Sequence, residues 1–278
     1  MINIPGNRFK SGRKAAPMRD ISALTSNFAV PAVQVILQDH PSLSNFGGQP
    51  CLPPGVGWPE KEGRELAFLA RISLAEVHCA VAIDWLPTTG ALLFFYDMEQ
   101  EPWGFDPKDR GSWSVLHVSD LEQPLEPTDQ AGNSSIPFKH AGFRGVDSYP
   151  SCRRGSVAAL EPTDAEEERY AEFVDLPYKG KPKHQISGFP DPVQGDHMEL
   201  ECQLASNGLY CGDASGYDDP RAQSLQDGAI EWKLLFQFDS DDDLDVMWGD
   251  SGTLYYWIRE QSARSGDFSN PWLVLQCC

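Results

Sequence analysis

The stretch Gly90-Ala-Leu-Leu-Phe-Phe-Tyr96 decides the fold class, because a similar stretch, Gly252-Thr-Leu-Tyr-Tyr-Trp-Ile258, occurs late in the chain. Each is a glycine followed by a nearly continuous apolar run rich in aromatic side chains, which is typical of a buried strand. A second apolar run precedes each one, Phe68-Leu-Ala-Arg-Ile-Ser-Leu74 and Leu234-Leu-Phe-Gln-Phe-Asp-Ser240. The shared order predicts an internal duplication. The alternative is that strand composition is narrow enough for unrelated strands to look alike.

The remaining elements are short, as the 24 glycines and 22 prolines indicate. Alternation of Leu200, Cys202 and Leu204 with polar residues predicts a half-exposed strand over 199–204. Helical spacing and a capping box of Thr163 and Glu166 predict a helix over 163–175, with the acidic run that starts at Glu166 on its solvated side. Similar patterns predict strands at 33–37, 113–118 and 270–276, and short helices at 20–28 and 73–79.

We therefore predict a mainly β (α+β) fold, with antiparallel sheets in a roll-like arrangement and a few short helices. Residues 1–18 are predicted to be a flexible basic arm, and residues 19–278 a single domain. Within that domain, two pseudo-repeat lobes, 30–118 and 186–278, flank a variable helical insert, 119–185. Each lobe has too few strands to close alone, so we expect the lobes to share one core.

The charge balance limits the classes of partner. Across 278 residues, 41 acidic and 22 basic side chains give a formal net charge of −19. Such a field repels nucleic acids and anionic membranes and favours basic proteins, basic peptides or cations, although it also serves solubility alone. No apolar run is long enough for a membrane span. The seven cysteines are odd in number and contain no C-x-x-C pair, which predicts reduced thiols in a cytoplasmic protein.

An acidic turn, residues 239–250, is the strongest candidate for a metal site. Asp239, Asp241, Asp243 and Asp250 fall at the first, third, fifth and twelfth positions of a calcium-loop template. Leu244, however, stands where that template requires glycine, and a strand precedes the turn, so the segment is no EF-hand. We therefore expect either a Ca²⁺ or Mg²⁺ site in a β-turn context or a solvated acidic turn.

A second polar cluster contains Asp191, Gln194, Asp196 and His197. On the predicted strand, His197, Glu199 and Glu201 share one face, which would suit acid–base chemistry or metal ligation. The alternative is an exposed strand face. Trp58, Trp103 and Trp248 lie in loops rich in glycine and proline, where they either line a binding cleft or pin the loops to a sheet.

Several of these stretches together resemble the YwqG-like family of bacterial proteins. The resemblance spans roughly residues 30–276 and includes Asn45–Pro59, Leu66–Leu74, Trp103–Pro107, Gly188–Asp196, Leu200–Leu204, Leu234–Asp241 and Met247–Gly252. It implies a mainly β, roll-like fold with a few helices. Because the family is a domain of unknown function, the resemblance carries over no catalytic residues. His197 and the segment 211–230 depart from the family pattern.

No recognisable catalytic signature emerges from the motifs. The sequence contains no nucleophile elbow, phosphate-binding glycine loop, dinucleotide fingerprint or H-E-x-x-H. Cys51 and Cys202 are more typical of buried apolar residues than of nucleophiles. Our first hypothesis is a non-enzymatic acidic binding protein for a protein or peptide ligand, with neutralisation of a basic toxin as one version. The alternative is a metal- or carboxylate-dependent hydrolase.

Overall fold

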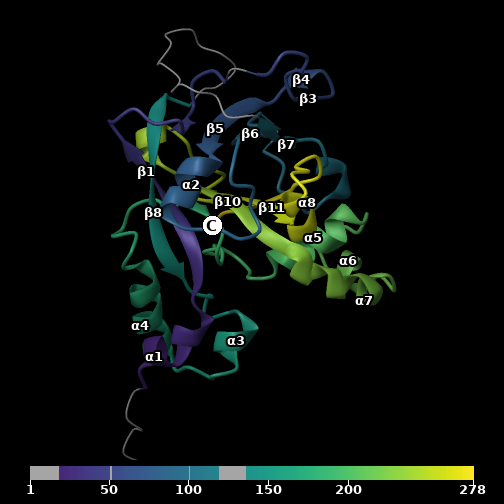
Figure 1. The fold of residues 1–278 in the computed structure, drawn as a ribbon. Helices are drawn as coiled ribbons and strands as arrows, with labels where there is room; N and C mark the ends of the chain where they lie inside the picture. The colour runs from purple at the N-terminus through teal and green to yellow at the C-terminus, as the bar shows by residue number, and fades with distance from the viewer. Residues whose placement is uncertain (1–18, 51, 100, 119–135) are drawn as a thin grey trace, which may run out of the picture.

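The fold is dominated by one large antiparallel sheet, so the mainly β prediction is confirmed (Figure 1). The computed structural model describes residues 19–50, 52–99, 101–118 and 136–278. The strands of the large sheet are β1 (Val30–Gln38), β2 (Asn45–Phe46), β5 (Ala67–Ser73), β6 (Ala91–Tyr96), β7 (Trp113–Val118), β8 (Lys139–Ser148), β9 (Gln185–Ile186), β10 (Trp232–Asp239), β11 (Thr253–Arg259) and β12 (Trp272–Gln276). A separate small hairpin pairs β3 (Glu60–Lys61) with β4 (Arg64–Glu65).

The sheet nearly closes on itself. Its strand order is β12-β11-β10-β9-β1-β8-β2-β5-β6-β7, so β12 and β7 form the two edges. The indole Nε1 of Trp113 on β7 donates a hydrogen bond of 3.1 Å to the carbonyl of Pro271, just before β12. The rings of Trp113 and Trp272 also pack edge to face, with centroids 5.1 Å apart. These contacts draw the two edges together, and closure protects edge strands from pairing with other chains.

The order of strands is similar when it is followed from either edge of the sheet. From β7 and from β12 alike, a three-strand meander is followed by a two-residue strand and then by a long strand. The registers correspond too, because Phe68 pairs with Phe95 as Leu234 pairs with Trp257, and each pairing is followed by a register shift. Residues 68–73 and 234–239 thus occupy corresponding places in the sheet.

The main hydrophobic core draws on both ends of the chain. Phe94 on β6 packs against Phe236 on β10 and Tyr256 on β11, with ring centroids 4.8 and 5.1 Å away. The Tyr256 hydroxyl donates a buried hydrogen bond of 3.0 Å to the carbonyl of Phe95. The halves therefore share buried apolar surface, which is the largest favourable contribution to folding.

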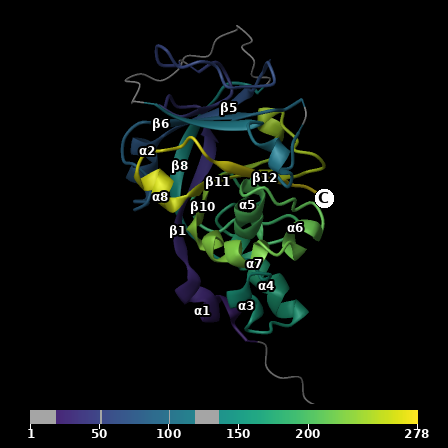
Figure 2. The same ribbon diagram turned by 90° about the vertical axis from the view of Figure 1, so that its right-hand side faces the viewer.

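Helices lie at the ends and on the outside of the sheet (Figure 2). Those at one end of the long β1–β8 pair are α1 (Ile21–Thr25), continued by η1 (Ser26–Phe28), α3 (Gly155–Ala158) and α4 (Asp164–Asp175). The others are α2 (Leu74–Ala80), η2 (Pro107–Asp109), α5 (Met198–Ser206), α6 (Ser215–Asp218), α7 (Ala222–Leu225), η3 (Gln226–Glu231), η4 (Asp242–Leu244) and α8 (Glu260–Arg264). Within the described ranges, no helix has the length and apolarity needed to cross a membrane.

Two features of the middle segment differ from the sequence prediction. The segment 119–185, which we predicted to be a helical insert, contains the long strand β8, and residues 140–148 of β8 pair with β1. The capping box at Thr163 is present, but Glu166 is buried, whereas we predicted it on the solvated side of the helix. The guanidinium of Arg19 holds both oxygens of Glu166, at 3.1 and 3.0 Å, and lowers the pKa of that carboxyl well below its usual range. The predicted arm, residues 1–18, lies outside the described residues.

Candidate functional site

Arg154, just before α3, joins two acidic side chains that α5 brings near it. Its Nη2 atom lies 2.7 Å from Asp196 Oδ1 and 2.8 Å from Glu199 Oε1, and its Nε donates to Asp196 Oδ2 at 3.2 Å. The side chain of Asp196 is fully buried, and the hydroxyl of Ser151 also donates to it. Burial alone would lower the pKa of Arg154, but the two carboxylates outweigh it and raise that pKa. Arg154 therefore fixes the start of α5 against the α3 segment.

A second ion-paired group comes from β10, α8 and the loop after α2. Glu260 lies 3.3 Å from Lys233 Nζ and 2.7 Å from Arg264 Nη2, and Arg264 also reaches Asp84 at 3.1 Å. These side chains are partly exposed, so each pair contributes little to stability. They do, however, place both signs of charge at one opening of the molecule.

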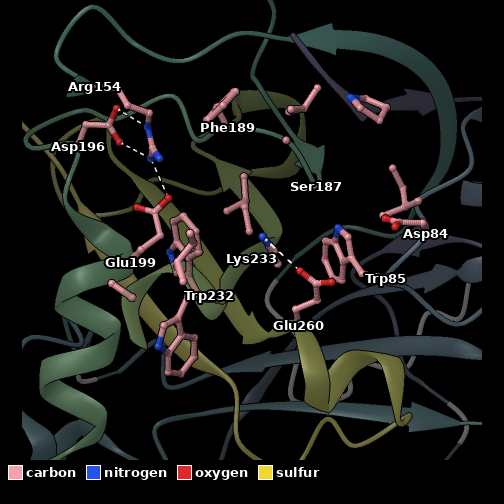
Figure 3. A pocket seen from close by; sticks show the side chains of 18 of the residues that line it. Asp84, Trp85, Arg154, Ser187, Phe189, Asp196, Glu199, Trp232, Lys233 and Glu260 are labelled. Atoms are coloured by element: carbon pink, nitrogen blue, oxygen red, sulfur yellow. Dashed lines mark hydrogen bonds and ion pairs between the residues drawn. The ribbon is translucent and has the colours of Figure 1, made fainter. Parts of the chain in front are cut away.

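Between these two groups lies a pocket of about 790 Å³ (Figure 3). Its lining comes from the start of β1, the loop after α2, the segment after β9, the start of α5, the η3–β10 junction, β11 and α8. Four carboxylates and three cationic side chains line it, namely Asp84, Asp196, Glu199, Glu260, Arg154, Lys233 and Arg264. The lining thus combines apolar residues with seven charged side chains, among which carboxylates exceed cations by one when the fully buried Asp196 is counted.

The innermost residues of the pocket lining are apolar and buried. Trp232, Leu234 and Trp257 all line the pocket and are at most 4% exposed. The Trp232 indole is fixed, because its Nε1 donates to Gln203 Oε1 at 3.0 Å and the guanidinium of Arg259 lies 4.8 Å from its ring centroid. The buried Nε1 of Trp257 has no hydrogen-bond partner.

The sequence-predicted binding residues divide into two sets. Asp196 and His197 line the pocket. Asp191 and Gln194 lie nearby on the loop after β9 but hold other partners: Asp191 pairs with Lys183 at 2.6 Å, and the Gln194 side chain donates to the carbonyl of Cys277 at 2.7 Å. Neither Asp191 nor Gln194 lines the pocket.

None of the three loop tryptophans lines the pocket. Trp248 is 1% exposed and packs edge-on against Tyr96, and Trp58 packs against Phe95. Trp103 is 40% exposed, and its carbonyl accepts a hydrogen bond from the backbone of Leu275. Trp58 and Trp248 therefore hold their loops on the sheet, which is the second of the two roles that the sequence left open.

The predicted strand over 199–204 is wrong, because these residues belong to helix α5. The alternation of polar and apolar residues had favoured a strand, but Met198, Cys202 and Ala205 instead form one buried helical face. In a helix His197, Glu199 and Glu201 no longer share a face. Glu199 points to Arg154 in the pocket, whereas Glu201 is buried elsewhere.

Glu201 is a buried carboxyl group with incomplete hydrogen bonding. It is 8% exposed, and its Oε2 atom has no hydrogen-bond partner. Burial raises the pKa of Glu201 to about 7, and the charges of Glu199 and Asp196 act in the same direction, whereas hydrogen bonding with Tyr217 opposes them. The side chain therefore carries a proton for much of the time near neutral pH.

In the acidic turn, the carboxylates at its start have partners within the protein. Asp239 accepts hydrogen bonds from the Thr253 hydroxyl at 2.7 Å and the Lys183 backbone at 2.9 Å. Asp241 pairs with His184 at 2.9 Å; its burial would raise its pKa, but this contact and the backbone N–H of Asp243 lower it.

The side chains of Asp243 and Asp250 are exposed. Over the described residues, no three His, Cys, Asp or Glu side chains are placed to hold one metal ion.

Some lining residues escaped the sequence analysis. Arg154, Phe189, Trp232 and Trp257 come from separate segments, and only the last two carry a sequence signal, as aromatics of the paired strands β10 and β11. No local pattern distinguishes Arg154 from other arginines.

The chain belongs to the family described as a domain of unknown function (DUF1963), whose model matches residues 44–277. No curated protein matches it. The matched range includes the pocket floor and α5, but leaves out β1.

Proposed function

We propose that the protein is a non-enzymatic binding protein that captures a basic protein or peptide at the pocket between Arg154 and Glu260. The observation that carries this proposal is the pocket itself. Its volume of about 790 Å³ falls within the range of about 300–1,000 Å³ that is typical of ligand sites. The lining mixes apolar side chains with charged groups that are held by ion pairs, and polar groups fixed in this way can orient a ligand.

Charge supports a basic partner. The chain carries a formal charge of −19, and four carboxylates against three cations are found among the residues that line the pocket. A field of this sign speeds the encounter with a cationic partner and disfavours acidic ones. Neutralisation of a basic toxin is one version of this role, since fast capture matters most there.

The assignments to a bacterial family and to the cytoplasm rest on the sequence. The YwqG-like motifs support a bacterial protein of that branch of the family. Cysteines that are free in the described part of the chain, such as Cys79 and Cys202, support the cytoplasm as its compartment.

We also propose that an internal duplication produced the two halves. The strand order supports it, since β7-β6-β5-β2-β8 corresponds to β12-β11-β10-β9-β1. So do the paired turns after β2 and β9: Asn45 Nδ2 donates to the carbonyl of Gly47, and Gln185 Nε2 to that of Ser187, at 2.8 and 2.7 Å. Both turn residues have positive φ. On this view the second repeat begins with β8, earlier than residue 186.

The binding proposal is tested with fluorescein-labelled peptides of alternating lysine and phenylalanine, compared with peptides in which glutamate replaces lysine. Fluorescence anisotropy at about 50 mM and about 500 mM NaCl measures affinity and its dependence on screening. We expect the lysine peptide to bind more tightly and to weaken with salt. Binding that ignores both charge and salt would refute the proposal.

Two matched variants locate the binding surface. Ile230 lines the pocket and is 76% exposed, whereas Leu176 is 67% exposed and does not line it. Ile230→Lys and Leu176→Lys change the net charge equally. We expect affinity for the lysine peptide to fall about tenfold in the first, as for a contact residue, and little in the second. Equal losses in both variants would place binding elsewhere.

A further inference from the structure

One carboxylate of the pocket keeps an oxygen open to a ligand. Glu199 on α5 accepts from Arg154 through Oε1 at 2.8 Å, and over the described residues no hydrogen bond or ion pair reaches its Oε2. Glu260 has both oxygens occupied, because Oε1 lies 2.7 Å from Arg264 and Oε2 lies 3.3 Å from Lys233. Figure 3 shows Glu199 and Glu260 on different sides of the pocket. The open acceptor therefore lies on the α5 side.

The other two carboxylates of the lining are less suited to hold a cation. Both oxygens of Asp196 accept from Arg154, and its Oδ2 also accepts from Ser151. Asp84 contacts Arg264 through Oδ2 alone, but its side chain is 85% exposed, whereas that of Glu199 is 21% exposed. Water and salt screen an exposed charge more than a partly buried one. A cation therefore gains more at Glu199 than at Asp84.

The local charge balance points to the same residue. The group around Arg154 has one cation for two carboxylates, whereas the second ion-paired group has two cations and two carboxylates. Asp196 is fully buried and forms an ion pair with Arg154, so Glu199 carries the negative charge that is in excess. Arg154 can stay in place when a ligand joins Glu199, because Asp196 holds its guanidinium at both Nε and Nη2.

We propose that Glu199 selects the ligand, and that its open oxygen receives the ammonium group of a lysine side chain. This inference rests on the proposed function and specifies its ligand: a peptide that is recognised through lysine in preference to arginine.

The preference follows from the geometry of the carboxylate. A guanidinium binds a carboxylate best through two parallel hydrogen bonds, one to each oxygen. Because Arg154 already occupies Oε1, Glu199 has a single oxygen to offer. An ammonium group is a compact point charge that needs only one acceptor there. Lysine can therefore complete its contact with Glu199, and arginine cannot.

The first experiment compares two cationic peptides of equal charge. One is the fluorescein-labelled peptide of alternating lysine and phenylalanine, and in the other arginine replaces every lysine. Fluorescence anisotropy at about 50 mM NaCl measures both affinities. We expect the lysine peptide to bind about three- to tenfold more tightly, as for one hydrogen bond that the guanidinium leaves incomplete. Equal affinities, or tighter binding of the arginine peptide, would overturn selection by Glu199.

Three variants that remove one negative charge each test the residue itself. Glu199→Gln and Asp84→Asn change the pocket, and Glu168→Gln changes an exposed site on α4. We expect Glu199→Gln to weaken binding of the lysine peptide about tenfold and to abolish the preference over arginine. Asp84→Asn should weaken binding about twofold and Glu168→Gln less, and both should keep the preference. Equal losses in all three variants would contradict the inference. If Glu199→Gln does not fold, the comparison of the two peptides decides.

The two proposals fail differently. If the lysine and arginine peptides bind equally and both weaken with salt, selection by Glu199 is wrong and the basic partner remains. If the lysine peptide binds no more tightly than the glutamate peptide, the proposed function itself is wrong, and selection by Glu199 fails with it.

Discussion

Glu201→Gln should stabilise the protein above neutral pH, and the structure gives the size of the effect. The carboxyl is 8% exposed with an unpartnered Oε2, and burial raises its pKa from the ordinary value of 4.5 to about 7. At about 1.4 kcal/mol per pKa unit, keeping this group ionised in the folded state costs about 3 kcal/mol. Glutamine has nearly the same shape and cannot ionise, so the variant avoids that cost.

The sign follows from which state holds the proton. Between about pH 4.5 and pH 7 the folded protein keeps a proton on Glu201 that the unfolded chain releases. The contribution of Glu201 to stability therefore falls as pH rises through this window, and the cost is complete above it. The variant should be more stable than the unaltered protein by less than about 1 kcal/mol near pH 5 and by about 3 kcal/mol at pH 8.

Urea unfolding followed by circular dichroism at pH 5, 6, 7 and 8 measures this difference. Glu168→Gln on the exposed side of α4 is the matched control, and its difference from the unaltered protein should not change in the same way. A constant gap between Glu201→Gln and the unaltered protein across this range would refute the reasoning. So would a variant that is less stable at pH 8.

Two further predictions concern the other charged clusters. Arg154→Met should lower the free energy of unfolding by about 3 kcal/mol, because it leaves the fully buried carboxylate of Asp196 without its cation. In urea unfolding, the double variant with Asp196→Asn should recover part of this loss. If the double variant loses as much stability as Arg154→Met or more, the unpaired carboxylate of Asp196 is not the cause. For the acidic turn, we expect Ca²⁺, Mg²⁺, Zn²⁺ and Mn²⁺ to leave the melting temperature unchanged, because Asp239 and Asp241 already accept hydrogen bonds within the protein. A rise that Asp250→Ala abolishes would instead favour the alternative proposal of a metal-dependent hydrolase.

The strands that the sequence predicted well are those with continuous apolar runs. β6 and β11 are buried along nearly their whole length, so their residues need no alternation and stand out from the rest of the chain. β8 carries the opposite signal, since Gly142 and Gly145 and several polar residues interrupt it. The structure explains Gly145, because a Cβ there would lie 2.4 Å from Val81 Cγ2. A strand whose glycines let neighbouring segments pack close to its backbone has few apolar residues that would identify it as a strand in the sequence.

The wrong prediction of a strand over 199–204, where the structure has α5, has a different cause. Polar residues on a buried helix are unfavourable unless they have hydrogen-bond partners, and the sequence does not show the partners of these residues. In the fold, Gln203 accepts hydrogen bonds from Trp232 and Arg259, at 3.0 and 2.8 Å, and so becomes a buried residue of the helix. Tertiary contacts from β10 and β11 thus override the local pattern. The same holds for the pocket, where Asp196 and His197 were identifiable but Arg154 was not.

The two halves cover the outer faces of their corresponding strands with different elements. In the first half the loop that contains Trp58 returns across β5 and β6 and seals the cluster of Phe68 and Phe95. In the second half α5 packs against β10 and β12, anchored at its start by Arg154. Trp257 is 1% exposed and Phe95 is fully buried, so the corresponding faces of the two halves are buried to the same extent although a helix packs in one half and a loop in the other.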